Sequence, residues 1–429
     1  MRFAGNHILL FAHPIPGVSC GWADSNWDLI FNEGNQTLSA HRDRIIQALD
    51  SLRIELPSWG FANTGTRFGK FLQLEAAATI EEKFADAAQV NALTGATPTL
   101  ALHVAWDLPG DLRDANKILD LAAQTGVRAG SINPNLFESQ SYKFGSICNP
   151  DPGIRRMAID HLLESVAIAK ALRSRDISVW LADGSNYPGT QSIRRRIEWM
   201  AEALAEVHAS LGDDQRLLVE YKPFEPAFYH TDLADWGMAL LIARQAGPKA
   251  CVLVDTGHHY HGQNIEQIVA WLLREKMLGG FHFNDRRYAD DDLTLGSIDP
   301  YQVFRIFHEL LSDSTSMATT AFMIDQSHNL KGKMEAMVQT VCTAQELFAK
   351  AAVVDRERLA TLQDECRLVE AEECLREGFW FDVRPVVQEW RSSRGLPADP
   401  LAALRASGYV ERIRSERRER NVCSVATYA

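Results

Sequence analysis

The alternation of eight short β-rich runs with amphipathic helical segments is the feature that most restricts the fold of this chain. The runs occupy residues 54–58, 99–103, 127–133, 177–182, 217–221, 251–255, 279–284 and 321–325. In the segments between them, apolar residues recur at spacings of three and four, which is typical of helices that pack one face on a sheet. Eight such units predict a parallel sheet closed into a (β/α)8 TIM barrel.

A doubly wound open sheet is the structural alternative. Nucleotide-binding sheets of that kind often carry a GxGxxG or P-loop pattern after the first strand, and neither pattern follows residues 54–58. Thr79 and Glu82 have the spacing of a capping box and predict the start of the helix after the first strand. The local signals therefore favour the barrel.

Three regions differ in their pattern. Residues 1–50 form an N-terminal segment that is partly helical, with a helical pattern from about Leu38. Residues 51–351 hold the predicted (β/α)8 catalytic barrel. Residues 352–429 are rich in Arg and Glu and lack β-rich runs, so they predict a helical C-terminal extension that provides subunit contacts.

Charge and cysteine usage restrict the class of protein. The 429 residues include 44 basic and 56 acidic side chains, for a formal net charge of −12. This balance disfavours non-specific nucleic-acid binding, which needs a positive surface. The seven cysteines form no CxxC pair and are interpreted as free thiols in a reducing compartment. No stretch is long enough to span a membrane, so we expect a cytoplasmic protein.

Four consecutive strands carry a metal-binding type of residue at or near their carboxyl ends. The residues are Glu220, Asp255, His282 and Asp325. The carboxyl ends of barrel strands meet at one rim, where TIM barrels carry their active sites. Three carboxylates gathered without a cation would cost several kcal/mol in repulsion and desolvation. An oxygen-rich set with one imidazole suits Mn²⁺, Mg²⁺ or Co²⁺.

A second group lies after strands six and seven. His258, Asp290 and Asp292 could share another ion, since residues i and i+2 of an extended backbone point the same way. Asp291 would then face solvent. The alternative, that the three consecutive aspartates form only a polar loop or a helix cap, stays open. A two-metal site would combine Lewis-acid polarisation with activation of a bound water.

Aromatic and polar residues follow the remaining strands. Aromatic faces beside hydrogen-bonding groups are what a sugar pocket requires, although each residue alone also suits ordinary core packing. Lys222 follows a predicted metal ligand and could hold a sugar oxygen and stabilise negative charge. Aromatic and polar residues of this kind near the strand ends are Trp59, Phe68, His103, Trp106, Asp107, Asn133, Asn135, Phe137 and Trp180.

Several long motifs resemble the bacterial L-rhamnose isomerases of the broad-specificity type, which also act on D-allose and related aldoses. The motifs are VEYKPFEPAFY, VDTGHH, GGFHFNDRRYADDDL, MIDQSHN, ALHVAWD and VWLADGSNYPGTQ, within a likeness that extends from about Pro57 to Tyr409. The resemblance implies a tetrameric TIM-barrel aldose–ketose isomerase with two divalent metals, most often Mn²⁺, with Mg²⁺, Co²⁺ or Zn²⁺ as alternatives. It assigns the first metal to Glu220, Asp255, His282 and Asp325, and the catalytic metal to His258, Asp290 and Asp292. The resemblance also makes the following residues candidate substrate contacts: Phe68, His103, Trp106, Phe137, Trp180 and Lys222.

The leading hypothesis is therefore a metal-dependent isomerase that interconverts a small aldose and its ketose. L-rhamnose is the first candidate substrate, followed by D-allose and D-ribose. Asp325, Lys222, Glu220 and His258 are the candidate catalytic residues, with Asp325 or a bound water as the base. Three alternatives stay open: a sugar epimerase of the same barrel superfamily, a metal-dependent endonuclease acting on damaged DNA, and a non-catalytic sugar-binding protein.

Overall fold

The computed structural model describes residues 27–63, 71–108, 114–224, 229–328 and 330–423. The chain divides into two units, residues 1–43 and 44–429. The described part of the first unit is helical throughout and belongs to α1 (Trp27–Ser51), which continues into the second unit. This helix begins before Leu38, where the sequence pattern first suggested one.

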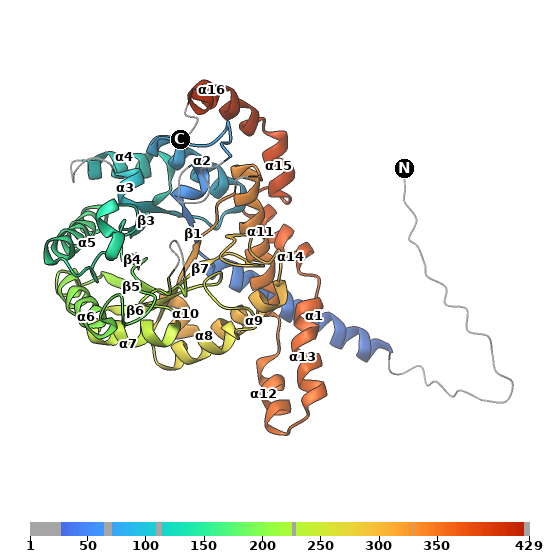
Figure 1. The fold of residues 1–429 in the computed structure, drawn as a ribbon. Coiled ribbons are helices and arrows are strands. Elements are labelled where there is room, and N and C mark those ends of the chain that lie inside the picture. Colours follow the sequence, from blue (N-terminus) through green and yellow to red (C-terminus); the bar gives the residue numbers. More distant parts are fainter. Residues whose placement is uncertain (1–26, 64–70, 109–113, 225–228, 329, 424–429) are drawn as a thin grey trace. The chain divides into compact units, whose positions relative to one another are not determined.

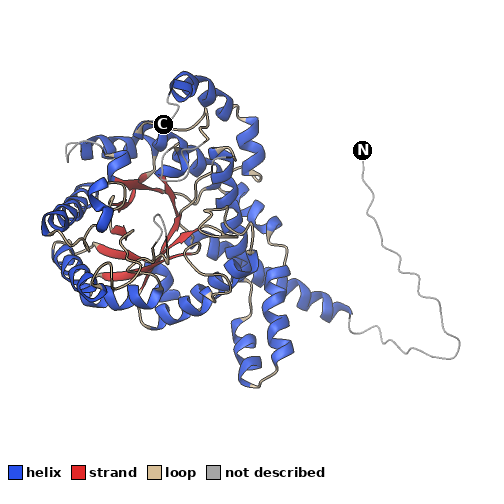
Figure 2. Ribbon diagram, in the orientation of Figure 1, coloured by secondary structure: helices blue, strands red, loops and turns tan. Residues whose placement is uncertain are grey.

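The second unit contains a closed sheet of parallel strands paired in chain order, β1 to β8 (Figure 1). The strands form an inner ring with helices outside it (Figure 2). The prediction of a TIM barrel is confirmed, and the open-sheet alternative is wrong because β1 pairs with β8 and leaves no edge. The strand bounds are β1 Ile54–Pro57, β2 Thr99–His103, β3 Arg128–Asn133, β4 Asp176–Trp180, β5 Arg216–Glu220, β6 Ala250–Asp255, β7 Leu278–Phe283 and β8 Ala321–Ile324.

Helices connect the strands and begin at good capping residues. Thr79 and Glu82 form the predicted capping box at the start of α2, and Asp151, Ser192 and Asn264 cap α5, α6 and α8. The main connecting helices are α2 Ile80–Thr94, α4 Asp114–Thr125, α5 Pro152–Leu172, α6 Ile193–Ala209, α7 Trp236–Ala246, α8 Ile265–Arg274, α9 Pro300–Leu311 and α11 Lys333–Ala352. Shorter elements are η1 Ser58–Phe61, α3 Val104–Asp107, η2 Gln140–Phe144 and α10 Ser314–Thr319.

The alternation along each strand separates the barrel interior from the helix layer. Leu218, Leu253 and Met323 form a buried cluster of their own, and each precedes a predicted metal ligand by two residues. Phe281 and Phe283 stack on each other at 4.7 Å, and Phe283 meets a ring of α9. Because neighbouring residues of a strand point to opposite faces, the residue between these phenylalanines must point into the barrel. That residue is His282.

More helices follow the barrel in the described chain. They are α12 Arg356–Asp364, α13 Leu368–Trp380, α14 Arg384–Ser393, α15 Pro400–Ala406 and α16 Tyr409–Cys423. Helices α12 and α13 are separated where Cys366 adopts a left-handed conformation with φ 55°. Helix α16 returns to the barrel, and Arg417 binds Asp86 of α2 through both guanidinium nitrogens. None of the described helices is both long enough and apolar enough to cross a membrane.

Candidate metal centre

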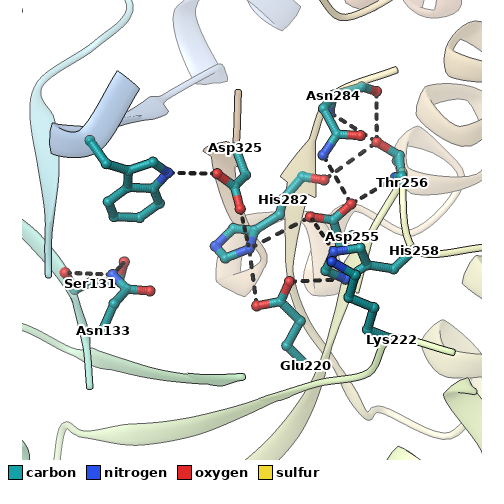
Figure 3. A network of polar contacts seen from close by, with 12 residues as sticks. Ser131, Asn133, Glu220, Lys222, Asp255, Thr256, His258, His282, Asn284 and Asp325 are labelled. Carbon is teal, nitrogen blue, oxygen red and sulfur yellow. Dashed lines mark hydrogen bonds and ion pairs between the residues drawn. The ribbon is translucent and has the colours of Figure 1, made fainter. Parts of the chain in front are cut away.

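The carboxyl ends of β5 to β8 bring four side chains together inside the barrel (Figure 3). Glu220 ends β5, Asp255 ends β6 opposite His282 of β7, and Asp325 directly follows β8. One possible ligand atom from each of the four residues lies within 4.8 Å of the others. The structure thus assembles the group that the strand ends predicted. We call it the first cluster.

The first cluster is buried and its carboxylates are held by donors from the surrounding loops. The side chains of Glu220, Asp255 and His282 are at most 4% exposed, whereas that of Asp325 is 24% exposed. The Trp59 Nε1 atom donates to Asp325 Oδ1 at 2.7 Å. Asn284 Nδ2 donates to Asp255 Oδ1 at 3.0 Å. Asp325 is therefore the member most accessible from the barrel mouth.

Burial and neighbouring charges shift the pKa values of the residues in the first cluster. Burial raises the pKa of Asp255 to about 7, with His258 opposing and Glu220 adding to the rise. Burial would lower the pKa of His282, but the facing Glu220 carboxylate outweighs it and raises that pKa to about 10. Burial also raises the pKa of Asp325. Burial would raise the pKa of Glu220, but the His282 ring outweighs it and lowers that pKa, so without a cation His282 carries the proton that balances Glu220.

The donor atoms of the first cluster fit a divalent cation. Asp255 Oδ2 and both ring nitrogens of His282 are buried and have no hydrogen-bond partner in the described part of the chain. The His282 Nδ1 atom lies 3.2 Å from Glu220 Oε2 and 3.7 Å from Asp325 Oδ2. Buried polar atoms are almost always satisfied, so such a concentration of unsatisfied ligand atoms indicates a missing partner. A hard or borderline cation satisfies carboxylate oxygens and imidazole together.

A second cluster shares Asp255 with the first. Ligand atoms of Asp255, His258 and Asp290 lie within 4.8 Å of one another, and all three side chains are buried. The His258 Nδ1 atom lies 3.0 Å from the Tyr221 carbonyl oxygen. A carbonyl only accepts, so the neutral His258 ring carries its proton on Nδ1 and leaves Nε2 for a cation.

The structure does not bring Asp292 into the second cluster. Asp292 is buried, but it is not among the residues whose ligand atoms meet there. The prediction assumed an extended backbone, whereas Asp292 adopts a left-handed conformation with φ 47°, so Asp290 and Asp292 do not follow the expected alternation. Asp291 is not simply solvated: its Oδ2 accepts from the backbone N–H groups of Arg287 and Tyr288 and closes the turn.

Lys222 lies at the second cluster. Its Nζ atom is 2.6 Å from Asp290 Oδ2 and 5.2 Å from the centre of the Trp180 ring. The ammonium group thus neutralises part of the second cluster and faces an aromatic wall. The first cluster has no Lys or Arg ion pair of this kind in the described chain.

Aromatic side chains from the first four strand ends surround the mouth opposite the clusters. His103 and Trp106 stack with ring centres 3.6 Å apart, and Phe137 lies 4.8 Å from Trp180. Trp59 approaches His103 edge-on at 6.4 Å. The predicted substrate contacts His103, Trp106, Phe137 and Trp180 therefore share one wall, while Phe68 lies outside the described residues.

Sequence reasoning overlooked several supporting residues. Asn284, which orients Asp255, directly follows β7 and had the same strand-end signal as the predicted ligands. Asp285, which had no predicted role, accepts from the backbone N–H groups of Ile298 and Asp299 and anchors the loop after β7. Buried Lys83 pairs with Asp107 after β2, and no sequence spacing indicated this contact.

A third buried group does not need a cation. Cys148, Asp183 and Asp232 offer ligand atoms within 4.8 Å of one another. Arg196 is fully buried, and its Nη2 atom donates to Asp232 Oδ2 at 2.8 Å. The Asp183 carboxylate accepts from the backbone N–H groups of Ser146 and Cys148. The group therefore has an internal counter-charge and satisfied oxygens, as a structural network does.

A protein-family model matches about half of this chain, and individual relatives match most of its length. The model of the xylose isomerase-like TIM barrel family matches residues 93–313. A protein of Rhizobium meliloti described as a "probable sugar isomerase" is 42% identical over 372 residues, which are 85% of this chain and 86% of the relative. A second "probable sugar isomerase", from Mesorhizobium japonicum, is 40% identical over 383 residues, 87% of this chain and 88% of the relative.

The likeness to solved structures concerns the fold alone. A 3-keto-D-glucoside 4-epimerase from E. coli superposes with a TM-score of 0.50 and 12% sequence identity, covering 68% of this chain and 99% of the other. At that identity the likeness concerns the barrel and not the reaction.

Proposed function

This chain belongs to the xylose isomerase-like TIM barrel family, and we propose that it is a metal-dependent isomerase that interconverts a small aldose and its ketose. The observation that carries the proposal is the first cluster, with its unsatisfied Asp255 Oδ2 and His282 nitrogens, next to the aromatic wall that Trp59 links to Asp325. The relatives described as sugar isomerases support the reaction class. L-rhamnose is the first candidate substrate, with D-allose and D-ribose as the next.

Two divalent cations, with Mn²⁺ as the first choice, are proposed for the two clusters. Glu220, Asp255, His282 and Asp325 would hold one ion, and Asp255, His258 and Asp290 the other. A cation in these positions supplies Lewis-acid polarisation of sugar oxygens and lowers the pKa of a hydroxyl or water. A second ion would also require Lys222 to leave Asp290.

The reaction defines what the side chains must do. Converting an aldose to a ketose moves one hydrogen from C2 to C1 and one proton from O2 to O1, with no external oxidant or reductant. Asp325 is the accessible carboxylate of the first cluster and is held by Trp59, so it is placed to exchange a proton at the barrel mouth. Lys222, once displaced from Asp290, could donate to a sugar oxygen that gains negative charge.

The aromatic wall supplies binding and excludes water. The C–H faces of a sugar pack on rings such as Trp106 and Phe137, while ring nitrogens of His103 can bond its hydroxyls. A pocket closed in this way strengthens each electrostatic interaction at the reacting carbons.

The test is turnover with restored metal. The protein is stripped with EDTA, reloaded with Mn²⁺, and incubated with L-rhamnose, D-allose, D-ribose and D-xylose, and the products are identified by NMR. Formation of the corresponding ketose supports the proposal. Exchange of configuration at one carbon without aldose–ketose conversion would replace it by an epimerase, and cleavage of abasic-site DNA would replace it by a nuclease. Absence of turnover with metal demonstrably bound contradicts it.

We also propose a homotetramer in which the helices after the barrel contribute subunit contacts. The large apolar side chains Leu368, Val369 and Trp380 are all exposed on the one helix α13, which supports this assignment, since exposed apolar surface is often covered in assemblies. Light scattering on the full chain should give four times the 48.0 kDa of one chain. A monomeric mass would contradict the proposal.

A further inference from the structure

A buried ion pair outside the two clusters lies directly behind the aromatic wall. Lys83 of α2 contacts Asp107 at the end of α3 through its Nζ atom, and their side chains are 2% and 0% exposed. An ion pair removed from water in this way carries a large desolvation cost, so its position calls for a physical explanation.

Asp107 uses its carboxylate to fix the turn that follows β2. One oxygen accepts from Lys83 Nζ, and the other accepts from Ser58 Oγ and from the His103 backbone N–H at 2.7 Å. The same turn carries His103 at its start and Trp106 near its end. Asp107 thus fastens the backbone of two wall residues to η1 and, through Lys83, to α2.

The ring of His103 is held by aromatic contacts, and its nitrogens have no hydrogen-bond partner in the described chain. It is stacked on Trp106 and edge-on to Phe137 at 5.8 Å. The residue is 4% exposed. The carboxylate of Asp107, the nearest acid on the same turn, bonds the His103 backbone and leaves the ring nitrogens available.

We propose that Lys83 is a positioning residue for His103: by pairing with Asp107 it fixes the turn and keeps the ring uncharged, so that one ring nitrogen donates to and the other accepts from hydroxyls of the sugar. The inference rests on the proposed function for the sugar as ligand. A neutral imidazole offers one donor and one acceptor, whereas a protonated ring offers only donors and would lose half of this recognition.

The charges around His103 agree with this role. Burial and then the Lys83 ammonium lower the pKa of His103 to about 3, and His161 of α5 acts in the same direction. Asp107 on α3 is the facing acid, while Trp59, Trp106 and Phe137 are uncharged. Without Lys83, the Asp107 carboxylate would be uncompensated and would favour a protonated ring.

The decisive variants are Lys83→Met, Lys83→Arg and the double variant Lys83→Met with Asp107→Asn. Loss of the ammonium should raise the pKa of His103, which ¹³C-labelled histidine NMR measures directly, with His103→Asn used for assignment. In Lys83→Met we expect kcat/KM to fall on the order of tenfold to a hundredfold. The acidic limb of its pH profile should move to higher pH, because the protonated ring persists further. Lys83→Arg keeps the charge and should restore most of the activity and the wild-type pH profile.

The double variant distinguishes the proposed role from simple misfolding. It removes both buried charges and should therefore keep a neutral His103 ring at neutral pH. Lys117→Met is the matched control: Lys117 pairs with Glu81 of α2, but at the surface with its side chain 54% exposed, and its loss should change neither readout. An unchanged His103 titration in folded Lys83→Met, or equal activity loss in Lys83→Met and Lys83→Arg, would overturn the inference. If wild type turns over no sugar, the proposed function fails, whereas the NMR titration and quenching of tryptophan fluorescence by bound sugar still decide the role of Lys83.

Discussion

The two clusters at the barrel mouth share Asp255 but differ in how their charge is balanced. The first, Glu220, Asp255, His282 and Asp325, gathers three carboxylates around one imidazole and has no lysine or arginine ion pair in the described chain. The second, Asp255, His258 and Asp290, has an ammonium from Lys222 on Asp290 Oδ2 at 2.6 Å. We therefore expect the first cluster to bind a cation more tightly, and the second to bind one only when Lys222 is displaced.

The largest effect is expected from Asp255→Asn, because Asp255 belongs to both clusters. The asparagine amide oxygen can still accept from Gly257 N–H and Asn284 Nδ2, so the local fold should persist. Metal content by mass spectrometry should drop at both clusters, and kcat/KM should fall on the order of 10³-fold or more. The metal-free variant should unfold at no lower temperature than metal-free wild type, since a buried charge is removed. Retention of both metals would show that Asp255 does not bridge the clusters.

Asp290→Asn distinguishes the contributions of the two clusters, because Asp290 belongs to the second cluster alone. Turnover should fall by about 10²-fold while one metal per chain remains bound. Asp291→Asn and Asp292→Asn are matched controls one and two residues away: neither residue belongs to the second cluster, and both variants should keep two metals. Full activity in Asp290→Asn would contradict a functional second metal at Asp290, whereas loss of one metal in Asp292→Asn would restore Asp292 to the ligand set expected from sequence.

Lys222→Met tests the internal counter-charge. Removing the ammonium from Asp290 should tighten Mn²⁺ binding at the second cluster by about tenfold, since a second cation no longer competes for the same carboxylate. Binding at the first cluster should change much less. Calorimetric titration of the EDTA-treated protein resolves the two affinities. Equal tightening at both clusters would mean that Lys222 acts through the overall potential and not through Asp290.

The smallest effect is a pH dependence of the metal-free protein. The pKa of His282 is raised to about 10, so its contribution to stability is complete below its ordinary value near 6.5 and is lost as pH rises through 10. Asp255, with its pKa raised to about 7, acts in the same direction between pH 4 and 7. We expect Tm to decrease by on the order of 5 °C from pH 7 to pH 10.

Glu220→Gln serves as the control for this pH dependence, because the Glu220 carboxylate is the main group that raises the pKa of His282. The variant should show a flatter Tm profile over the same range. A rise in Tm with pH in the metal-free wild type would contradict the assignment of a protonated His282.

The first cluster was predictable from sequence, and the second only partly. Glu220, Asp255 and Asp325 sit at the ends of apolar runs whose boundaries are clear, and two phenylalanines fix the direction of His282. Asp290 and Asp292 lie in a loop, where no alternation of apolar residues reveals the backbone angles. The left-handed conformation of Asp292 departs from the extended backbone on which its assignment to the second cluster relied. The break at Cys366 was hidden for the same reason.

Hydrophobic periodicity was sufficient to define the barrel and the rim residues. Parallel strands buried on both faces and helices buried on one face produce a repeating pattern of apolar residues in the sequence. It could not reveal that Lys222 lies on Asp290, that Asp255 serves two clusters, or that Lys83 reaches Asp107 behind His103. These contacts join residues far apart in the chain and depend on loop dihedrals and side-chain directions. Only the closed barrel brings them within hydrogen-bonding distance, and there the balance of charge is set by distances that no local pattern encodes.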